Sequence, residues 1–262
     1  PFNFIIFSIS SMKKLILSGI LALTSVCAFA QNVQLHYDLG HSLYNGGDKD
    51  LSNRGHYTTT VENFKADKWG STYFFVDMDY KSTGAAKNSN CLGAYMEISR
   101  ELCFWQDTKL NWLSFHVEYN GGLSTAASSF HNAWLTGLTY SGHSADYSKT
   151  WSLSALYKYI PGTVSAAGNK EEHNFQITGV WGINFANGWC TFSGFVDFWR
   201  ENRPWQDTRF IALSEPQFWV NLNKISGMRD VNLSVGGEVE LSYNFAGKGF
   251  YAIPTLAAKW SF

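Results

Sequence analysis

Three residues in the run 111–120 could together support hydrolysis. Ser114, His116 and Glu118 alternate there, so a strand would place them on one face. A hydroxyl, an imidazole and a carboxylate within reach of one another are the groups of a nucleophilic hydrolase. The same alternation is common by chance, and the sequence contains no G-x-S-x-G elbow. A hydrolase is therefore a minor alternative, and no residue is assigned as catalytic.

The cysteines and charged residues give no sign of a metal site. Cys91, Cys103 and Cys190 lack the spacing of metal ligands, and the His, Asp and Glu residues are scattered. These three cysteines cannot all pair within the chain, so at least one free thiol is expected, and one disulfide pair stays open. No G-x-x-x-x-G-K phosphate loop occurs. The formal net charge of −1 gives no argument for a nucleic-acid partner. We predict neither metal nor cofactor.

The last segment, 249–262, indicates which kind of element positions the polar side chains. Alternate residues form one wholly apolar face that ends in Trp260 and Phe262, and the opposite face is mixed. Aromatic side chains near both ends of the apolar face are typical of a strand that spans a membrane. A terminal strand that ends in Phe resembles the assembly signal of bacterial outer-membrane β-barrels. This resemblance makes the barrel assembly machinery an expected partner.

The other end of the chain has the features of a secretory signal. Met12, Lys13 and Lys14 begin a basic segment, an apolar run follows to Phe29, and Ala28-Phe29-Ala30 forms an A-x-A cleavage site. The apolar run is too short for a spanning helix. We therefore expect residues 1–30 to comprise upstream residues and a cleaved signal peptide, and residues 31–262 to form the exported domain.

Period-two alternation and turn signals predict twelve strands. They cover 33–43, 56–66, 71–81, 92–104, 111–120, 131–141, 151–160, 174–185, 189–199, 209–223, 231–245 and 249–262. Asn187-Gly188 marks a hairpin, and Pro216 predicts a bulge or weak pairing because Pro donates no ladder bond. An even strand count is the rule for bacterial barrels. The predicted fold is an all-β, 12-stranded antiparallel transmembrane β-barrel of bacterial outer-membrane type, surrounded by outer-membrane lipid.

In such a barrel the polar face of each strand points inward. The predicted lumen-lining and solute-contacting residues are Glu62, Tyr73, Phe75, Asp77, Asp79, Glu97, His116, Glu118, Gln217, Glu238 and Glu240. Carboxylates and amides can hydrogen-bond a polar solute, and aromatic rings can stack on one. The alternative for each residue is that its charge only solvates the lumen and pairs with another lumen charge.

One stretch resembles a known family. Tyr57, Glu62, Phe64, Asp67 and Trp69, followed by Asp77, are similar to the early strands of the Tsx-like nucleoside-specific channel-forming outer-membrane proteins, including a branch from gut bacteria. The run Met96-Glu97-Ile98 also matches a strand of that family. The resemblance is strongest over 54–101, and the terminal Trp-Ser-Phe departs from the family's usual ending. It implies a barrel with Glu62, Asp77 and Glu97 in the lumen.

The leading function is an outer-membrane channel for passive, selective uptake of small polar solutes, with nucleosides as the first candidate. Such transport needs a lined pore and no catalytic group. Two alternatives stay open. A closed structural or adhesion barrel would have a lumen plugged by charge pairs, and the hydrolase would use Ser114 and His116.

Overall fold

The computed structural model describes residues 31–81, 91–125 and 132–262. β-strands make up most of this part of the chain. The strands are β1 (Asn32–Asp38), β2 (Tyr57–Asp67), β3 (Gly70–Tyr80), β4 (Cys91–Leu102), β5 (Leu113–Ser124), β6 (Ala133–His143), β7 (Lys149–Tyr159), β8 (His173–Phe185), β9 (Cys190–Arg203), β10 (Thr208–Ser214), β11 (Gln217–Asn221), β12 (Leu233–Tyr243) and β13 (Phe250–Ser261). The predicted signal peptide lies outside the described residues and stays a prediction.

The strands form one antiparallel sheet that closes on itself. Apart from β10 and β11, each strand pairs with its neighbours in the chain, and β13 pairs with both β12 and β1. β10 and β11 together occupy one strand position in the barrel wall, because both pair with β9 on one side and β12 on the other. We call each strand position a stave. The barrel therefore has twelve staves, which confirms the predicted fold.

The tenth stave is interrupted at Glu215 and Pro216, where a bulge or weak pairing was predicted. Pro216 donates no hydrogen bond, but its carbonyl accepts one from the Val239 backbone N–H at 3.1 Å. The Glu215 N–H donates to the Phe195 carbonyl, also at 3.1 Å. Gly194 allows this close approach, since a Cβ there would lie 2.5 Å from the Glu215 carbonyl oxygen.

The first strand is shorter than predicted. It ends at Asp38 rather than Leu43, and the chain turns into the short helix α2 (Gly40–Leu43). The Asp38 carboxylate accepts the Gly40 backbone N–H at 2.5 Å, which stabilises the turn. Four 3₁₀ turns lie between strands: η1 (Gly47–Lys49), η2 (Ala186–Gly188), η3 (Pro204–Gln206) and η4 (Leu222–Lys224). Among the described residues, no helix is long and apolar enough to cross a membrane.

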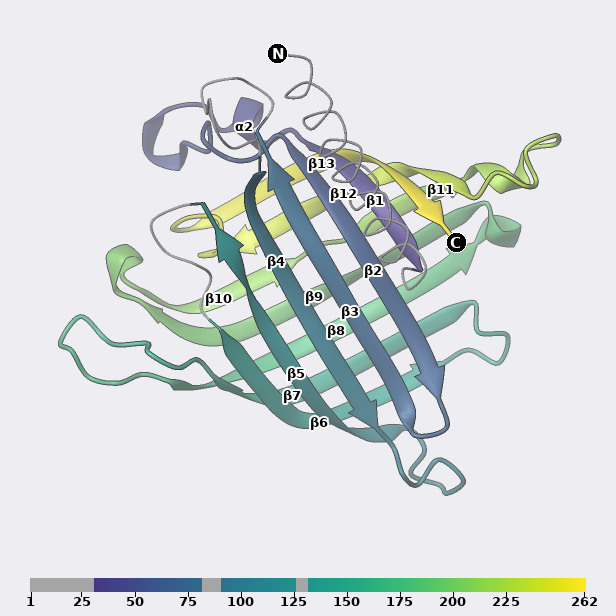
Figure 1. Cartoon of the computed structure of the whole chain (residues 1–262), viewed down its shortest axis with the longest axis horizontal. Coiled ribbons are helices and arrows are strands. Elements are labelled where there is room, and N and C mark those ends of the chain that lie inside the picture. The colour runs from purple at the N-terminus through teal and green to yellow at the C-terminus, as the bar shows by residue number, and fades with distance from the viewer. Residues whose placement is uncertain (1–30, 82–90, 126–131) are drawn as a thin grey trace, which may run out of the picture.

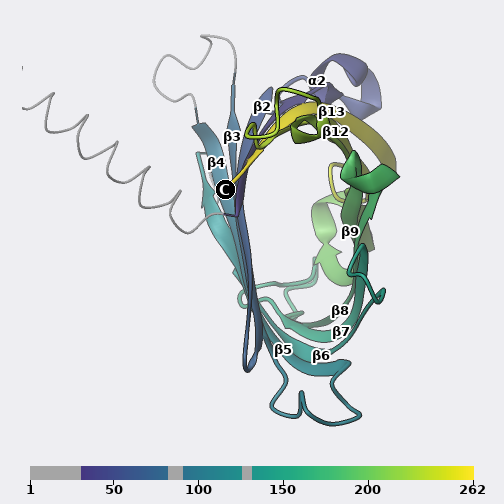
Figure 2. The ribbon, with the colours of Figure 1, turned by 90° about the vertical axis from the view of Figure 1, so that its right-hand side faces the viewer.

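The barrel is flattened rather than round. Seen along its axis, β2, β3 and β4 form a nearly straight wall, and β8 and β9 curve around the opposite side (Figure 2). β12 and β13 close one end of this oval, and β5, β6 and β7 close the other. The strands tilt strongly across the barrel (Figure 1). The narrow dimension therefore separates the β3–β4 wall from the β9–β11 wall.

The two faces of the sheet differ in polarity. Along β1 the inward side chains of Gln34 and His36 are buried, with His36 only 2 % exposed, whereas the outward Leu35 is 52 % exposed. Similar outward apolar side chains occur around the described barrel, which is the surface that a lipid bilayer requires. One charged pair breaks this surface: the Arg100 guanidinium donates to both carboxylate oxygens of Asp67, at 2.7 and 2.8 Å.

Candidate solute passage in the barrel interior

The closed register places all the predicted lumen residues on the inward face. Glu62 lies opposite Phe75, and Phe75 lies opposite Glu97, so their side chains share the interior across three strands. The same alternation turns Asp77 and Asp79 inward. The remaining members that point inward are Tyr73, His116, Glu118, Gln217, Glu238 and Glu240. Whether these residues contact a solute stays a prediction.

A buried network fills the end of the oval formed by β12, β13 and β1. The His36 ring nitrogens lie 2.9 Å from the Thr255 hydroxyl and 2.9 Å from the Gln34 side-chain oxygen. The Trp219 ring packs edge-on against His36, with 6.0 Å between the ring centroids. Trp219 and, farther along β13, Ile253 are fully buried. Close packing of this kind leaves no room for a solute at this end of the barrel.

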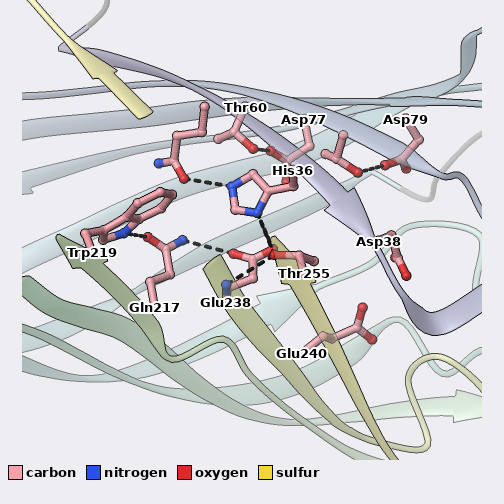
Figure 3. Close-up of polar contacts among 12 residues, drawn as sticks. His36, Asp38, Thr60, Asp77, Asp79, Gln217, Trp219, Glu238, Glu240 and Thr255 are labelled. Carbon is pink, nitrogen blue, oxygen red and sulfur yellow. Dashed lines mark hydrogen bonds and ion pairs between the residues drawn. The ribbon is translucent and has the colours of Figure 1, made fainter. Parts of the chain in front are cut away.

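The network continues toward the middle of the barrel. Trp219 donates its indole N–H to the Gln217 side-chain oxygen at 3.0 Å, and the Gln217 amide donates to Glu238 at 3.0 Å (Figure 3). These bonds fix the side chains of Gln217 and Glu238, two of the predicted lumen residues. Glu238 also lies 3.4 Å from a His36 ring nitrogen. Gln217 and Glu238 therefore form the border between the filled end and the middle of the lumen.

The opposite end, formed by β5, β6 and β7, is filled by a second network. The two ring nitrogens of His116 lie 2.5 Å from a Glu101 oxygen and 3.0 Å from a Glu118 oxygen. Donating from both nitrogens requires the imidazolium form, so one cation stands between two carboxylates. The buried side chains of Leu135 and Leu156 pack nearby on the same inward face.

The same contacts bear on the hydrolase alternative. The Ser114 hydroxyl donates to Glu101, not to His116, and both His116 nitrogens already face carboxylates. A nucleophilic serine needs a neutral imidazole nitrogen as the acceptor of its proton. Ser114 and His116 are thus brought together without the geometry that hydrolysis requires.

Carboxylates line the middle of the lumen on both walls. On β3, Asp77 and Asp79 accept hydroxyl hydrogen bonds from Thr60 and Thr58, at 2.5 and 2.6 Å (Figure 3). Each bond holds one carboxylate oxygen against the wall. Across the short dimension, the charge of Glu215 interacts with that of Asp77. Carboxylates of both walls therefore face the space between them in the middle of the barrel, which we call the gap.

A second group of carboxylates extends this gap along β4 and β9. The Tyr95 hydroxyl donates to Glu97 at 2.7 Å, and the Thr178 hydroxyl donates to Asp197 at 2.5 Å. Glu97 and Asp197 lie on facing walls, and their charges interact. Phe75 stands between the two acidic groups of the β3–β4 wall, with its ring centroid 6.1 Å from that of Tyr95.

The interior cations described by the structure are engaged by other groups. Lys158 donates to Gln176 at 2.7 Å, and its ammonium lies 4.7 Å from the centre of the Trp199 ring. Lys259 lies 4.2 Å above Trp219 at the filled end. The side chains that face the gap include acidic and aromatic ones, such as Asp77, Glu97 and Phe75.

Arg54 is a functional candidate that alternation could not reveal, because it lies in the loop between α2 and β2. Its guanidinium enters the barrel mouth, where it donates to Asp38 at 2.6 Å and also to Glu240. Desolvation alone would lower the Arg54 pKa, but the two carboxylates outweigh it and raise that pKa. The position of Asp38 was detectable, since Gln34, His36 and Asp38 alternate along the first strand.

A groove of about 770 Å³ lies outside this passage. It runs over the outward face of β3 to β8 and is lined by Ile98, Arg100, Trp134, Tyr157 and His173, among others. These side chains face lipid, so the groove is separate from the interior. Among the described residues, no group of three His, Cys, Asp or Glu could hold a metal ion. No disulfide bond joins Cys91, Cys103 and Cys190.

Comparison with known families assigns the chain to a family. The family described as "Domain of unknown function (DUF5020)" matches residues 30–262. The chain belongs to the DUF5020 family. No curated protein matches it in sequence. The description of the DUF5020 family carries no substrate, so the Tsx-like resemblance gains no support for nucleoside specificity from it.

Solved structures similar to this DUF5020 barrel share its architecture at very low sequence identity. A NanC porin has a TM-score of 0.54 at 9 % identity, over 88 % of this chain and 99 % of that chain. LpxR from Salmonella typhimurium has a TM-score of 0.43 at 8 % identity, again over 88 % and 99 %. The first likeness concerns the fold alone, and the second is too weak to carry an argument. The barrel fold and its apolar outer surface place the DUF5020 chain in the bacterial outer membrane.

Proposed function

We propose that this barrel is a passive channel for small polar solutes, without enzymatic activity, and that nucleosides are the first solutes to test. The observation that carries the proposal is the contrast between the filled ends and the middle. His36, Trp219 and His116 are buried at the two ends, whereas Phe75 and Glu97 in the middle keep part of their surface accessible. A lined gap with accessible polar and aromatic side chains is what selective passage requires.

The nucleoside proposal rests on two kinds of side chain in the gap. Tyr73, Phe75 and Tyr95 form a row of rings with centroids 6.1 Å apart in each successive pair, on which a base could stack. Carboxylates such as Asp77 and Glu97 could accept hydrogen bonds from ribose hydroxyls. The known fold supports a channel in general, since one similar solved structure is a porin by name.

The test is solute entry into liposomes that contain the purified, refolded protein. Nucleosides are compared with sugars of similar size, and folding is checked by circular dichroism. Faster nucleoside entry would support a nucleoside-selective channel, and equal entry would support a general one. No entry of either solute into liposomes with folded protein would contradict the channel and favour the closed structural barrel.

Assembly is part of the same proposal. We infer that the barrel assembly machinery recognises β13, which closes the barrel between β12 and β1 and ends beside Phe262. The Phe262 backbone N–H donates to the Gln31 carbonyl at 3.0 Å, so the last residue continues the ladder to the N-terminal strand.

A further inference from the structure

One group of side chains, between the gap and the His116 end, contains two acceptor oxygens that have no hydrogen-bond donor. We call Glu97, Glu118, Asn120 and Asp197 the Glu97 cluster; the argument rests on the channel proposed above and concerns its substrate class. In Glu118, one carboxylate oxygen faces His116 at 3.0 Å, and the other, Oε1, is buried without a hydrogen-bond partner. Buried polar atoms in proteins nearly always have a partner.

Asn120 gives a second and independent sign of a missing donor. Its side chain is only 3 % exposed, and its Oδ1 has no hydrogen-bond partner. Asn120 lies directly opposite Glu97 in the β4–β5 ladder, so the two inward side chains start within about 5 Å of each other. An amide oxygen is an acceptor only. Glu97, Glu118 and Asn120 thus present adjacent acceptor oxygens to the interior.

The charge of the cluster points to the kind of donor. Glu97, Glu118 and Asp197 interact electrostatically with one another across the lumen. Lys158 is near enough to interact with all three, but its ammonium already donates to Gln176. With Glu101, which shares the His116 cation with Glu118, four carboxylates face two cations, Lys158 and His116, so the group stays negative. A neutral hydroxyl could satisfy an acceptor, but only a cation would also offset this charge.

The neighbouring rings fit the same ligand. Tyr95 holds Glu97 through its hydroxyl at 2.7 Å, and Phe75 lies beside Tyr95 on the same wall. Aromatic faces attract ammonium and guanidinium groups. We propose that the Glu97 cluster binds the ammonium or guanidinium group of a passing solute, so that the channel prefers cationic small solutes to neutral or anionic solutes of equal size.

The experiment compares solutes that share one sugar skeleton and differ in charge. The refolded protein is placed in planar lipid bilayers for the reversal potential in a KCl gradient, and in liposomes for entry of glucosamine, glucose and glucuronate. We expect a cation-selective reversal potential and glucosamine entry that exceeds glucose entry by roughly threefold to tenfold, with glucuronate slowest. Competition by arginine should slow glucosamine entry.

Variants assign the preference to the cluster. Glu97→Gln removes one charge at constant shape, and Asn120→Leu removes the unpartnered acceptor without changing charge. Both should bring glucosamine entry close to glucose entry, and only Glu97→Gln should shift the reversal potential strongly. The control is Asp107→Asn, which removes an exposed carboxylate between β4 and β5, outside the lumen. It should leave both readouts unchanged.

The outcomes separate this inference from the proposed function. Conductance with no cation preference, or a preference that both variants leave intact, would overturn the cationic substrate class and leave the channel standing. No conductance and no entry in folded protein would overturn the channel and the inference together. If Glu97→Gln does not fold, Asn120→Leu alone decides, because a retained glucosamine preference in that variant contradicts the proposed binding step.

Discussion

Single residues determine which parts of the barrel interior are filled by side chains. Arg54 is the most informative, because a loop residue supplies the cation for Asp38 and Glu240, two buried carboxylates of different strands. These contacts fasten the loop that contains α2 to the mouth of the barrel. Alternation along strands could predict that Glu240 points inward. It could not predict Arg54, because loop residues follow no period.

We expect Arg54→Met to lower the free energy of unfolding by about 3 kcal/mol, since it leaves two buried carboxylates without their cation. Urea unfolding in lipid vesicles, followed by tryptophan fluorescence, measures this. Arg229→Met is the control, because Arg229 is exposed between β11 and β12. Equal stability of the two variants would show that the loop is not held by this contact.

His116 is expected to be a structural cation rather than a catalytic base. His116→Ala should lower the free energy of unfolding by about 3 kcal/mol, because Glu101 and Glu118 would face each other without it. Ser114→Ala should cost only about 1 kcal/mol, the typical value for one hydrogen bond. The same unfolding assay measures both. Lipid hydrolysis by the wild type that Ser114→Ala abolishes would instead support the hydrolase alternative.

At the scale of elements, the sequence predicted where strands lie better than where they end. The alternation of 249–262 and of 231–245 gave the right strands and the right facing. It extended the latter past Tyr243, because polar and apolar residues can alternate in a turn as well. The end of β1 was missed for a local reason, since the Asp38 side chain captures the Gly40 backbone N–H.

The broken tenth stave provides a test at this scale. Gly194→Ala should destabilise the barrel by roughly 1–3 kcal/mol, because the new methyl group would overlap the Glu215 carbonyl oxygen at an unfavourable positive φ of 154°. Gly182→Ala is the matched control, since the nearest atom to its Cβ is the flexible Thr150 hydroxyl at 3.0 Å. Urea midpoints of the two variants should differ, and identical midpoints would contradict the close approach.

For the whole molecule, closure depends on β13. Its register with β1 and β12 extends from one rim of the barrel to the other, and the polar contacts of Thr255 join it to His36. The sequence predicted closure through the even number of strands and the terminal aromatic. It could not predict the flattening, because that depends on how His36, Trp219 and His116 fill the two ends.

Deletion of Phe262 should reduce the amount of folded barrel in the outer membrane several-fold, because it removes the terminal aromatic and the last bond to Gln31. Membrane fractionation and the heat-dependent shift in gel mobility measure folded barrel. A deletion of Phe250, on the same outward face at the other rim, controls for loss of an aromatic residue alone. Normal levels without Phe262 would contradict the assembly signal.

The lipid-facing pair of Arg100 and Asp67 determines the position of the barrel along the bilayer normal. A charged side chain on the lipid face costs about 2–4 kcal/mol at the bilayer midplane but only about 0–1 kcal/mol near the headgroups. Asp67 ends β2 on the rim where β1 begins and β13 ends, so the pair marks the level of the lipid headgroups at that rim. In a thicker or thinner bilayer, the rim at Asp67 would then stay at the level of the headgroups. The opposite rim, where the long loops emerge, would shift relative to the bilayer surface.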